Sequence, residues 1–425
     1  MTIIKRASNI IKEQGLLHML EIARIMLSDR IRGRIVYPFC RDVYARRLRQ
    51  ICIRNRVVLW NQYFGWSVAL FQRPQHIAKN LASRNCTVFY YTDRIYDPDV
   101  TSMKEILPNL FLVNQKNYFF ICELLRYLDT IPQQKYIQVY STNMDMTLEE
   151  LKKYEEKGYQ ILYEYIDDLA PEISGTKELP KNIQEKFDYV TRDDHIPMVV
   201  TADLLREQIL SLRGEKNLAF ATNGVDIDHF RDIQQIAPFQ EKYQAVLAKK
   251  HPIVGYYGAL AKWFDYDLLK YAASQLPDVE FVLIGKLYDD SFALSGLEQV
   301  SNVHFIGPVP YQQIPQYATH FSICTIPFQV NNITNATSPL KLFEYMALGK
   351  PILTTAMLES SKYRSVNIAA DPADFVNKIR LLLKYTPERN PEYYALLKQE
   401  AEENGWGKKA DSILAMLSVY EEEKI

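Results

Sequence analysis

The chain of 425 residues is long enough to form two domains of ordinary size. Its formal net charge of −1 excludes the strongly basic balance of a nucleic-acid binder, so we expect no nucleic-acid partner. No run of about 18 uncharged apolar residues occurs, and charges interrupt residues 1–28, so we expect neither a membrane span nor a signal peptide.

The five cysteines are dispersed, without a CxxC pair or histidines at zinc-ligand spacing. This pattern predicts free thiols in a reducing compartment, and therefore a cytoplasmic protein.

Residues 1–56 differ in charge from the rest of the chain. They hold 13 Lys or Arg against four Asp or Glu, a net charge of +9, which leaves about −10 for the remainder. Apolar residues recur in this segment at helical spacing: Leu16, Met19, Leu20, Ala23, Met26 and Leu27. Such a basic amphipathic segment suits an anionic membrane surface. The alternative is a helical extension packed on the main body, with its arginines in solvent.

Short apolar strands then alternate with helical patterns. Predicted strands cover 57–60, 86–91, 110–113, 136–140, 161–165, 198–201 and 218–221, and a predicted helix covers 73–83. This alternation predicts a doubly wound parallel sheet, in which sites lie beyond the carboxyl ends of the strands.

Polar candidates follow two of these strands. In the loop 61–76, Gly65 permits close backbone approach, and Arg73 and His76 lie near the start of the next helix. A histidine suits proton transfer near neutral pH, although His76 as a packed or surface residue is the alternative. Asp167 and Asp168 follow the strand 161–165 and either hold acceptor hydroxyls or form an ordinary loop or capping pair.

The alternation restarts after a polar stretch. Predicted strands cover 253–257, 280–284, 303–306 and 321–326, and predicted helices cover 267–274, 311–318 and 406–420. Gly258, Gly285 and Gly307 each follow a strand, as is required where the backbone approaches a ligand. They form no GxGxxG, so the dinucleotide fingerprint is absent.

The stretch 331–355 predicts a loop, a short helix and a strand. Ser338 is expected as the N-cap, Pro339 at the first helical position, Gly349 just beyond the helix, and a strand at 352–355. The free amides at such a helix start attract anions.

Two charged residues of this helix share one face. Lys341 adds a cation in the first turn, and Glu344 lies three residues on. We expect Lys341 and the amides to bind a nucleotide diphosphate, and Glu344 to accept hydrogen bonds from ribose hydroxyls. The alternative is an ordinary capped helix with an exposed Lys–Glu pair.

The segment SPLKLFEYMALGKPIL resembles the donor-site helix of GT-B-type, retaining glycosyltransferases of group 1, which use nucleotide sugars in bacterial surface-polysaccharide synthesis. The order of glycines and motifs over 253–355 resembles their whole donor domain. Ala336 stands where the family carries an earlier Glu, and part of that contact is expected from Asn331, Asn332, Asn335 or Thr337. The stretch ATNGVD at 221–226 resembles the end of the family's first domain.

The resemblance implies an α/β chain with two Rossmann-like, doubly wound parallel-sheet domains that face each other across a cleft. The expected parts are a basic helical extension (1–52), an acceptor-side domain (53–230), a linker (231–250), a donor domain (251–400) and a helix that crosses back to the first domain (401–425).

The resemblance also implies site residues. Those expected to act in catalysis are Lys341, Glu344, Lys262 and His76. Those expected to bind the nucleotide sugar are Gly258, Lys262, Gly285, Asn335, Thr337, Ser338, Pro339, Leu340, Lys341 and Glu344. Those expected on the acceptor side are Gly65, Trp66, Arg73, His76, Asp167 and Asp168.

The implied function is transfer of a sugar from a nucleoside-diphosphate sugar to a glycan or lipid-linked glycan, by a cytoplasmic protein that is peripheral on the inner face of the membrane. The triplets D-x-D at 97–99, 226–228 and 265–267 spell the metal-binding motif of another glycosyltransferase architecture, but we interpret them as loop residues and expect no cofactor or essential metal. The alternatives are an epimerase or phosphorylase of the same fold, or a non-catalytic sugar-nucleotide or lipid-binding scaffold.

Overall fold

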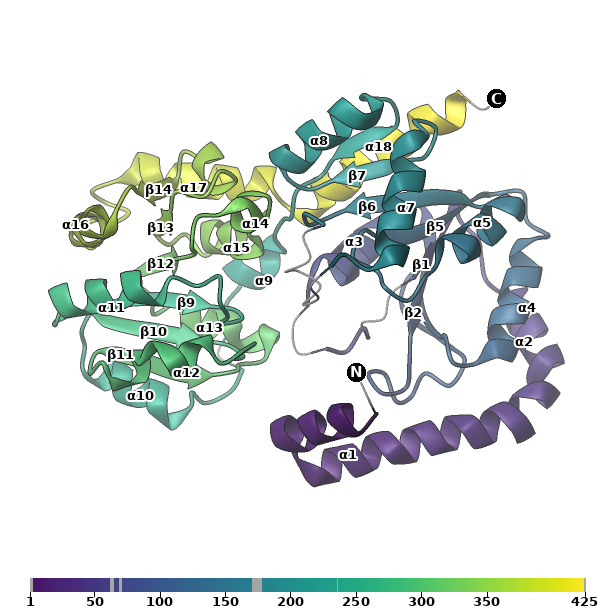
Figure 1. Ribbon diagram of the computed structural model, residues 1–425, viewed down its shortest axis with the longest axis horizontal. Coiled ribbons are helices and arrows are strands. Elements are labelled where there is room, and N and C mark those ends of the chain that lie inside the picture. The colour runs from purple at the N-terminus through teal and green to yellow at the C-terminus, as the bar shows by residue number, and fades with distance from the viewer. Residues whose placement is uncertain (1–2, 62–64, 69–70, 170–177, 235, 424–425) are drawn as a thin grey trace. The chain divides into compact units, whose positions relative to one another are not determined.

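The computed structural model describes residues 3–61, 65–68, 71–169, 178–234 and 236–423, and the side chains of the first helix from Leu17 onward except His18 (Figure 1). The chain divides into two compact units. Unit 1 comprises Met1–Glu164 and Lys181–Val190, and unit 2 comprises Tyr165–Pro180 and Thr191–Ile425. The cut at Tyr165 differs from the linker expected at 231–250, and the domain boundaries derived from the sequence stay a prediction.

The first sheet has eight strands in the order β3-β4-β2-β1-β5-β6-β7-β8. Their bounds are β1 Arg56–Trp60, β2 Cys86–Thr92, β3 Met103–Leu107, β4 Leu110–Asn114, β5 Gln134–Tyr140, β6 Gln160–Tyr165, β7 Met198–Val200 and β8 Leu218–Phe220. The described pairings are parallel except that of β3 with β4. The predicted strands are thus confirmed, and β3 is an addition. Its sequence MKEIL does not alternate apolar and polar residues, so the pattern predicts no strand there. In the structure, only Met103 of this strand is buried.

Helices of the first part of the chain include the predicted N-terminal extension. They are α1 Ile3–Ile35, η1 Tyr37–Cys40, α2 Arg41–Leu48, α3 Arg73–Ala82, α4 Tyr118–Leu128, α5 Leu148–Glu156 and α7 Lys181–Arg192. The extension is attached through α2, which packs on α4: the rings of Tyr44 and Phe120 meet edge to face at 5.2 Å, and Tyr44 and Leu48 are buried.

The second sheet is parallel throughout, in the order β11-β10-β9-β12-β13-β14, and lies within unit 2. Its strands are β9 Ile253–Tyr257, β10 Glu280–Ile284, β11 Val303–Gly307, β12 Ile323–Ile326, β13 Ile352–Thr355 and β14 Val366–Ala369. Every residue of β9 and β10 is buried, as expected for central strands covered on both faces. Only β14 was not predicted, because its sequence VNIA carries one polar residue among three apolar ones.

The helices of the remaining chain are α8 Asp203–Arg213, α9 Ile227–Arg231, α10 Glu241–Ala248, α11 Tyr266–Gln275, α12 Ser291–Ser295, η2 Leu297–Gln299, η3 Tyr311–Gln313, α13 Ile314–Ala318, α14 Asn332–Asn335, α15 Leu340–Ala347, η4 Ser360–Lys362, α16 Pro372–Leu382, α17 Pro391–Glu403 and α18 Trp406–Glu422.

Two of the predicted elements differ in the structure. The helix expected at 311–318 is split into η3 and α13, because Pro315 lacks the N–H that a continuous helix would need there. The loop expected before the donor-site helix contains α14, which is closed by a capping box between Asn331 and Thr334. Among the helices that the structure describes, none combines the length and apolar character needed to cross a bilayer.

Candidate functional site

Glycines, which have no side chain, stand at the carboxyl ends of three strands of the second sheet. Gly258 and Gly285 follow β9 and β10 with φ of +141° and +147°, and Gly307 ends β11 with φ of +89°. A Cβ on Gly285 would lie 1.9 Å from the carbonyl oxygen of Gly258, so only glycine allows these two turns to lie against each other. The amide of Gly258 donates to Ile284, and that of Gly285 donates to Gly307.

Lys341 lies directly on this glycine edge. A Cβ on Gly258 would be 1.9 Å from Cε and 2.7 Å from Nζ of Lys341. The ammonium group also lies 5.6 Å from the ring centre of Tyr256 and 5.9 Å from that of Phe328. Burial lowers the pKa of Lys341, and the carboxylate of Glu344 opposes this shift. The structure thus brings together Gly258 and Lys341, which are 83 positions apart in the sequence.

Glu344 is only 3% exposed, so the exposed Lys–Glu pair considered as an alternative is not present. Burial raises the pKa of Glu344 to about 7, while Lys341 and the hydroxyls of Tyr257 and Tyr311 lower it. The pKa of the carboxyl group therefore lies near neutral pH, because burial disfavours its charged form more than its neighbours favour that form.

The start of α15 departs from the prediction. Pro339, with φ −72° and ψ 114°, is the N-cap, and no side chain among the described residues caps the helix. Ser338 was expected to cap it, but its hydroxyl instead accepts from the backbone N–H of Asn223 at 3.2 Å. The amide side chain of Asn223 also donates to the carbonyl of Ser338 at 2.8 Å. Because no described side chain caps this first turn, its amides stay candidates for an anion, and the anion binding predicted from the sequence stays a prediction.

Asn223 belongs to the stretch ATNGVD, to which the sequence assigned no function. Its neighbour Gly224 packs on the junction of α17 and α18, where a Cβ would lie 2.6 Å from the carbonyl oxygen of Asn404. Val225 donates to Asn404 and accepts from Trp406 at this junction. Asn-Gly pairs signal turns, but no local pattern reveals that this turn holds the start of α15.

Other polar residues near α15 are engaged by the fold. The Oδ1 atom of Asn335 accepts from the backbone of Leu358 at 3.0 Å, and Thr337 donates its hydroxyl to Ile333 at 2.8 Å. Asn331 caps α14, and Ala336 is buried. Their expected contact with a donor sugar stays a prediction.

Lys262, the second expected cation, is exposed in the loop after β9. Its backbone N–H donates to Asp289 at 3.0 Å, which fixes the loop and leaves the side chain at the surface. Lys262 therefore differs from Lys341, which the glycine edge holds in place.

The acceptor-side candidates in unit 1 are mostly buried. Arg73 is 4% exposed, and its Nε donates to Glu164 at 2.8 Å. His76 is 1% exposed, with its ring 4.7 Å from that of Phe71. The burial of His76 is as expected from the alternative in which it is a packed histidine.

The loop around Gly65 is held by Asp97, which accepts from the backbone of Trp66 at 2.9 Å and of Ser67 at 3.1 Å. A Cβ on Gly65 would lie 1.9 Å from Cβ of Tyr96. Residues 62–64 and 69–70 of the same loop lie outside the described residues.

Asp167 and Asp168 fall in unit 2 and are half-buried, and Asp168 accepts from the hydroxyl of Tyr165 at 3.5 Å. Two of the D-x-D triplets also serve the fold. Asp97 holds the loop at Trp66, and Asp265 caps α11 by accepting from Leu268.

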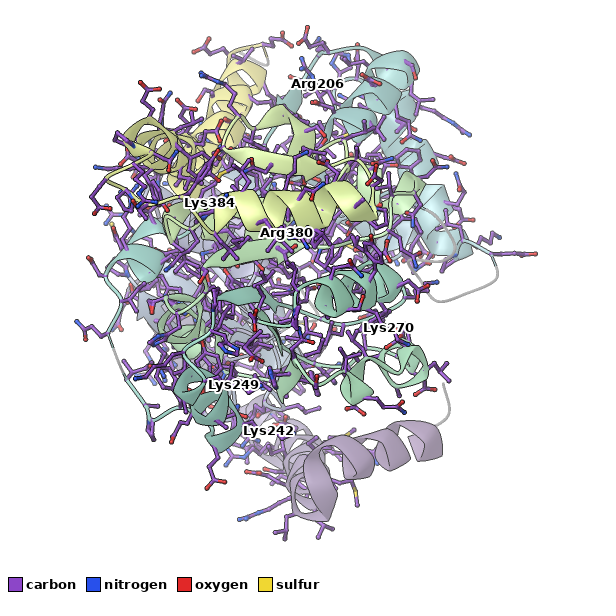
Figure 2. The ribbon with its side chains drawn as sticks, turned by 90° about the vertical axis from the view of Figure 1, so that its left-hand side faces the viewer. Arg206, Lys242, Lys249, Lys270, Arg380 and Lys384 are labelled. Carbon is purple, nitrogen blue, oxygen red and sulfur yellow. The ribbon has the colours of Figure 1, made fainter. Side chains whose placement is uncertain are left out.

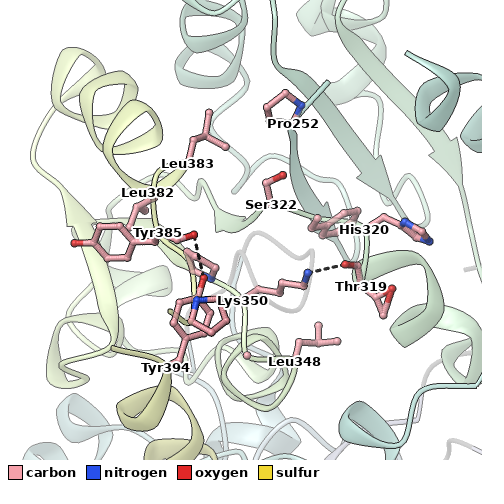
Figure 3. Close-up of a pocket in the computed structure, with 14 residues that line it drawn as sticks. Pro252, Thr319, His320, Ser322, Leu348, Lys350, Leu382, Leu383, Tyr385 and Tyr394 are labelled. Carbon is pink, nitrogen blue, oxygen red and sulfur yellow. Dashed lines mark hydrogen bonds between the residues drawn. The ribbon is translucent and has the colours of Figure 1, made fainter. Parts of the chain in front are cut away.

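A separate pocket of about 460 Å³ opens at the other end of the strands of unit 2 (Figure 3). Pro252, Ser322 and Pro351, which precede β9, β12 and β13, contribute to its lining. In the pocket, Nζ of Lys350 donates to the carbonyl of Thr319 at 2.6 Å and so caps the end of α13. The pocket contains none of the predicted site residues.

Comparisons with known proteins relate the second sheet and the fold to proteins already described. Residues 251–385 match the family described as Glycosyl transferases group 1. A Bacillus subtilis (strain 168) protein named for teichuronic acid biosynthesis, the glycosyltransferase TuaH, is 26% identical over 231 residues. This match covers 51% of the present chain and 57% of the relative, so it spans little more than half of that protein.

Solved structures share the fold over nearly the whole chain. WaaG, a glycosyltransferase of lipopolysaccharide biosynthesis, matches with a TM-score of 0.53 at 14% identity, over 84% of this chain and 97% of its own. Anabaena HepE, solved with UDP and glucose, matches with 0.56 at 13% identity, over 86% and 99%. OtsA matches with 0.61 at 10% identity, over 85% and 98%. The chain has the GT-B fold, and its residues 251–385 match the family described as Glycosyl transferases group 1.

Proposed function

We propose that this protein is a glycosyltransferase that moves a hexosyl or other glycosyl group from a nucleoside-diphosphate sugar to a glycan or lipid-linked glycan in polysaccharide biosynthesis. The observation that carries the proposal is the position of Lys341: its ammonium lies on Gly258, at the strand ends and in the first turn of the uncapped helix α15. The family of residues 251–385 and the UDP-bound neighbour HepE support a nucleotide-sugar donor.

The chemistry asked of these residues is stabilisation of a leaving diphosphate. Lys341 and the amides at the start of α15 offset the negative charge that develops as the glycosidic bond to the diphosphate breaks. Lys262 approaches the second phosphate from its loop. Glu344 in its ionised form accepts from the ribose hydroxyls, in exchange for the hydroxyls of Tyr257 and Tyr311 that face it in this structure.

We infer retention from the resemblance of the donor-site helix to retaining glycosyltransferases. We also infer that the reaction needs no metal ion, since Lys341 supplies the charge that a cation would otherwise bring. Turnover is expected to be equal in EDTA and in Mg²⁺. Full loss of activity in EDTA that a divalent ion restores would contradict this inference.

We also infer that the loop at Gly65 and Trp66 contributes to the acceptor side, with the buried Arg73 and His76 supporting this loop from behind. Asp167 and Asp168 are proposed as acceptor contacts of unit 2. The basic residues 1–56 are proposed to bring the protein to the inner face of the bacterial membrane, where a lipid-linked acceptor would lie.

The test is a thermal-shift screen with UDP-, GDP-, dTDP- and CMP-sugars, because a bound donor raises the melting temperature by mass action. Lys341→Ala and Glu344→Ala should each abolish the shift. Unchanged shifts in both variants would place the donor elsewhere. Release of the free nucleotide only with acceptor present would exclude an epimerase. A parent that binds donors and never turns them over would be a scaffold.

A further inference from the structure

Helix α1 exposes a stripe of large aliphatic side chains. These stripe residues are Leu17, Leu20, Leu27, Ile31 and Ile35, with exposed fractions of 48–83%. Their spacing of three, seven, four and four positions places them on one face of the helix. No residue of α1 whose side chain the structure describes is buried. Of the apolar residues predicted to form one face, Leu20, Ala23, Met26 and Leu27 are exposed and Met19 is half-buried, while the side chain of Leu16 lies outside the described residues.

The opposite face of α1 is tied to unit 1. Asp29 accepts from Arg94 at 2.8 Å and from the hydroxyl of Tyr37 at 3.3 Å, and Arg94 also donates to Ser28. Both members of the Arg94–Asp29 pair are about one-eighth exposed. The rotation of the helix is thereby fixed, so the exposure of the stripe is not the result of a freely turning tail.

The apolar exposure continues past the end of α1. Phe39 in η1 is 85% exposed and Val43 in α2 is 51% exposed, although Tyr37, Tyr44 and Leu48 of the same segment are buried. One side of the whole segment α1–η1–α2 thus binds unit 1, while aliphatic and aromatic side chains stand on its outside.

Basic side chains lie beside the stripe and, at Arg24, within it, since Arg24 follows Leu20 by four positions and precedes Leu27 by three. Arg24, Arg30 and Arg34 are exposed along α1, within a segment whose net charge is +9. A helix with exposed apolar residues between arginines binds in the plane of an anionic bilayer surface, where the aliphatic groups enter the acyl boundary and the arginines meet the phosphates. A second copy of the same face would bring arginines against arginines, which charge repulsion disfavours.

The basic residues of unit 2 lack this combination. Arg206, Lys242, Lys270 and Arg380 are spread over α8, α10, α11 and α16, and Lys249 and Lys384 lie just beyond the ends of α10 and α16 (Figure 2). Several are engaged locally: Lys249 pairs with Glu280, Lys270 donates to Ser295, and Arg380 donates to Gln275. Charge alone therefore does not single out α1, whereas charge with an ordered apolar stripe does.

We propose that the stripe of α1 inserts into the headgroup–acyl boundary of an anionic lipid bilayer. The inference rests on the proposed function, because it supplies the lipid surface on which a lipid-linked acceptor would be met. It goes beyond electrostatic attraction, since it assigns the hold on the membrane to named aliphatic side chains.

The test is sedimentation of the full chain with vesicles of phosphatidylcholine and phosphatidylglycerol in equal parts. Leu27→Glu/Ile31→Glu should weaken binding more than about tenfold, because two aliphatic groups that would enter the bilayer are replaced by charges. The matched control is Leu212→Glu/Leu294→Glu, which changes two exposed leucines of unit 2 (52% and 84%) and should bind as the parent does. A third variant, Arg24→Gln/Arg30→Gln/Arg34→Gln, should bind more weakly than the parent at low salt, and this difference should narrow as salt increases.

Equal sedimentation of the stripe variant and the parent would overturn the inference. The inference would also be overturned if the parent did not sediment with vesicles and light scattering showed a dimeric parent and a monomeric stripe variant. The thermal shift with donor sugar separates the two proposals: it should be the same in the stripe variant as in the parent. If the parent shows no donor shift but still binds vesicles through the stripe, the proposed function fails and this inference stands.

Discussion

Gly258 lacks a side chain at the point where the cation of the site needs room. Its position against Cε and Nζ of Lys341, together with φ of +141°, excludes every larger residue without a rearrangement. The absence of a side chain at Gly258 therefore determines where the ammonium group of Lys341 lies. A larger residue at position 258 would displace this ammonium group.

We predict that Gly258→Ala displaces Lys341, lowers donor affinity by more than about tenfold and costs at least about 2 kcal/mol of stability. Isothermal titration with the donor found in the screen measures the affinity, and urea unfolding measures the stability. The control is Gly349→Ala, at φ +63° with no atom within 4 Å of the new Cβ, which should cost about 1 kcal/mol and leave affinity unchanged. Similar affinity losses in both variants would contradict the prediction.

Glu344 predicts a pH dependence of donor binding. With a pKa of about 7, its carboxylate is mostly neutral at pH 6 and mostly ionised at pH 8, and only the ionised form accepts hydrogen bonds with both oxygens. Donor affinity should therefore rise up to about tenfold from pH 6 to pH 8. Affinity measured across this range in parent and Glu344→Gln checks the prediction, and an unchanged slope in the variant would contradict it.

The same group affects stability in the opposite direction. Because burial raises its pKa in the folded state from 4.5 to about 7, the folded form binds the proton more tightly than the unfolded form. The stabilisation is full below pH 4.5 and is lost as pH rises through 7, by at most about 3 kcal/mol. The free energy of unfolding of Glu344→Gln should lack this decline relative to the parent.

Helix α15 depends on the turn at Asn223 for the position of its first residues. The N–H and side-chain amide of Asn223 hold Ser338, immediately before the N-cap Pro339. The turn thus fixes the end of the helix that would meet the diphosphate.

We predict that Asn223→Ala costs about 1 kcal/mol of stability and weakens donor binding about fivefold, since one hydrogen bond is lost and the helix start is less constrained. The control is Asn377→Ala, on the exposed surface of α16. A change in donor affinity in both variants, or in neither, would show that the turn does not position α15.

The elements of the chain were predictable where a local pattern determines them. Apolar runs such as 253–257 predicted the strands, and Gly349 predicted the end of α15. The sequence also placed Gly258 and Lys341 in one site. The contacts of Glu344 with Tyr257 and Tyr311, and of Ser338 with Asn223, were not predictable. They join residues far apart in the chain, and nothing in the local sequence around Tyr311 or Asn223 marks these partners.

At the scale of the whole molecule, the chain divides into two compact units. Lys341, Glu344 and the glycine edge all belong to unit 2, whereas Arg73 and His76 belong to unit 1. Two such units need not unfold together, so a single melting temperature is not a sufficient description.

We predict that calorimetry with donor sugar raises the transition of unit 2 and leaves that of unit 1 in place, because only the folded form of unit 2 holds the ligand. Unit 1 is identified by Leu81→Ala, a fully buried change in α3 that should lower its transition. Lys341→Ala should remove the donor effect. A donor shift of the transition that Leu81→Ala lowers would contradict the prediction.

The turn 223–225 touches α15 at one end and the junction of α17 with α18 at the other. Because hydrogen bonds hold this short segment at both ends, a shift at one end is expected to shift the other. A ligand that steadies the start of α15 should also slow amide exchange at Trp406, and a substitution that loosens α17 or α18 should weaken binding at the proposed donor site, because coupling between two sites is reciprocal. Distant substitutions in α18 are thus expected to alter the proposed reaction without any contact with its substrates.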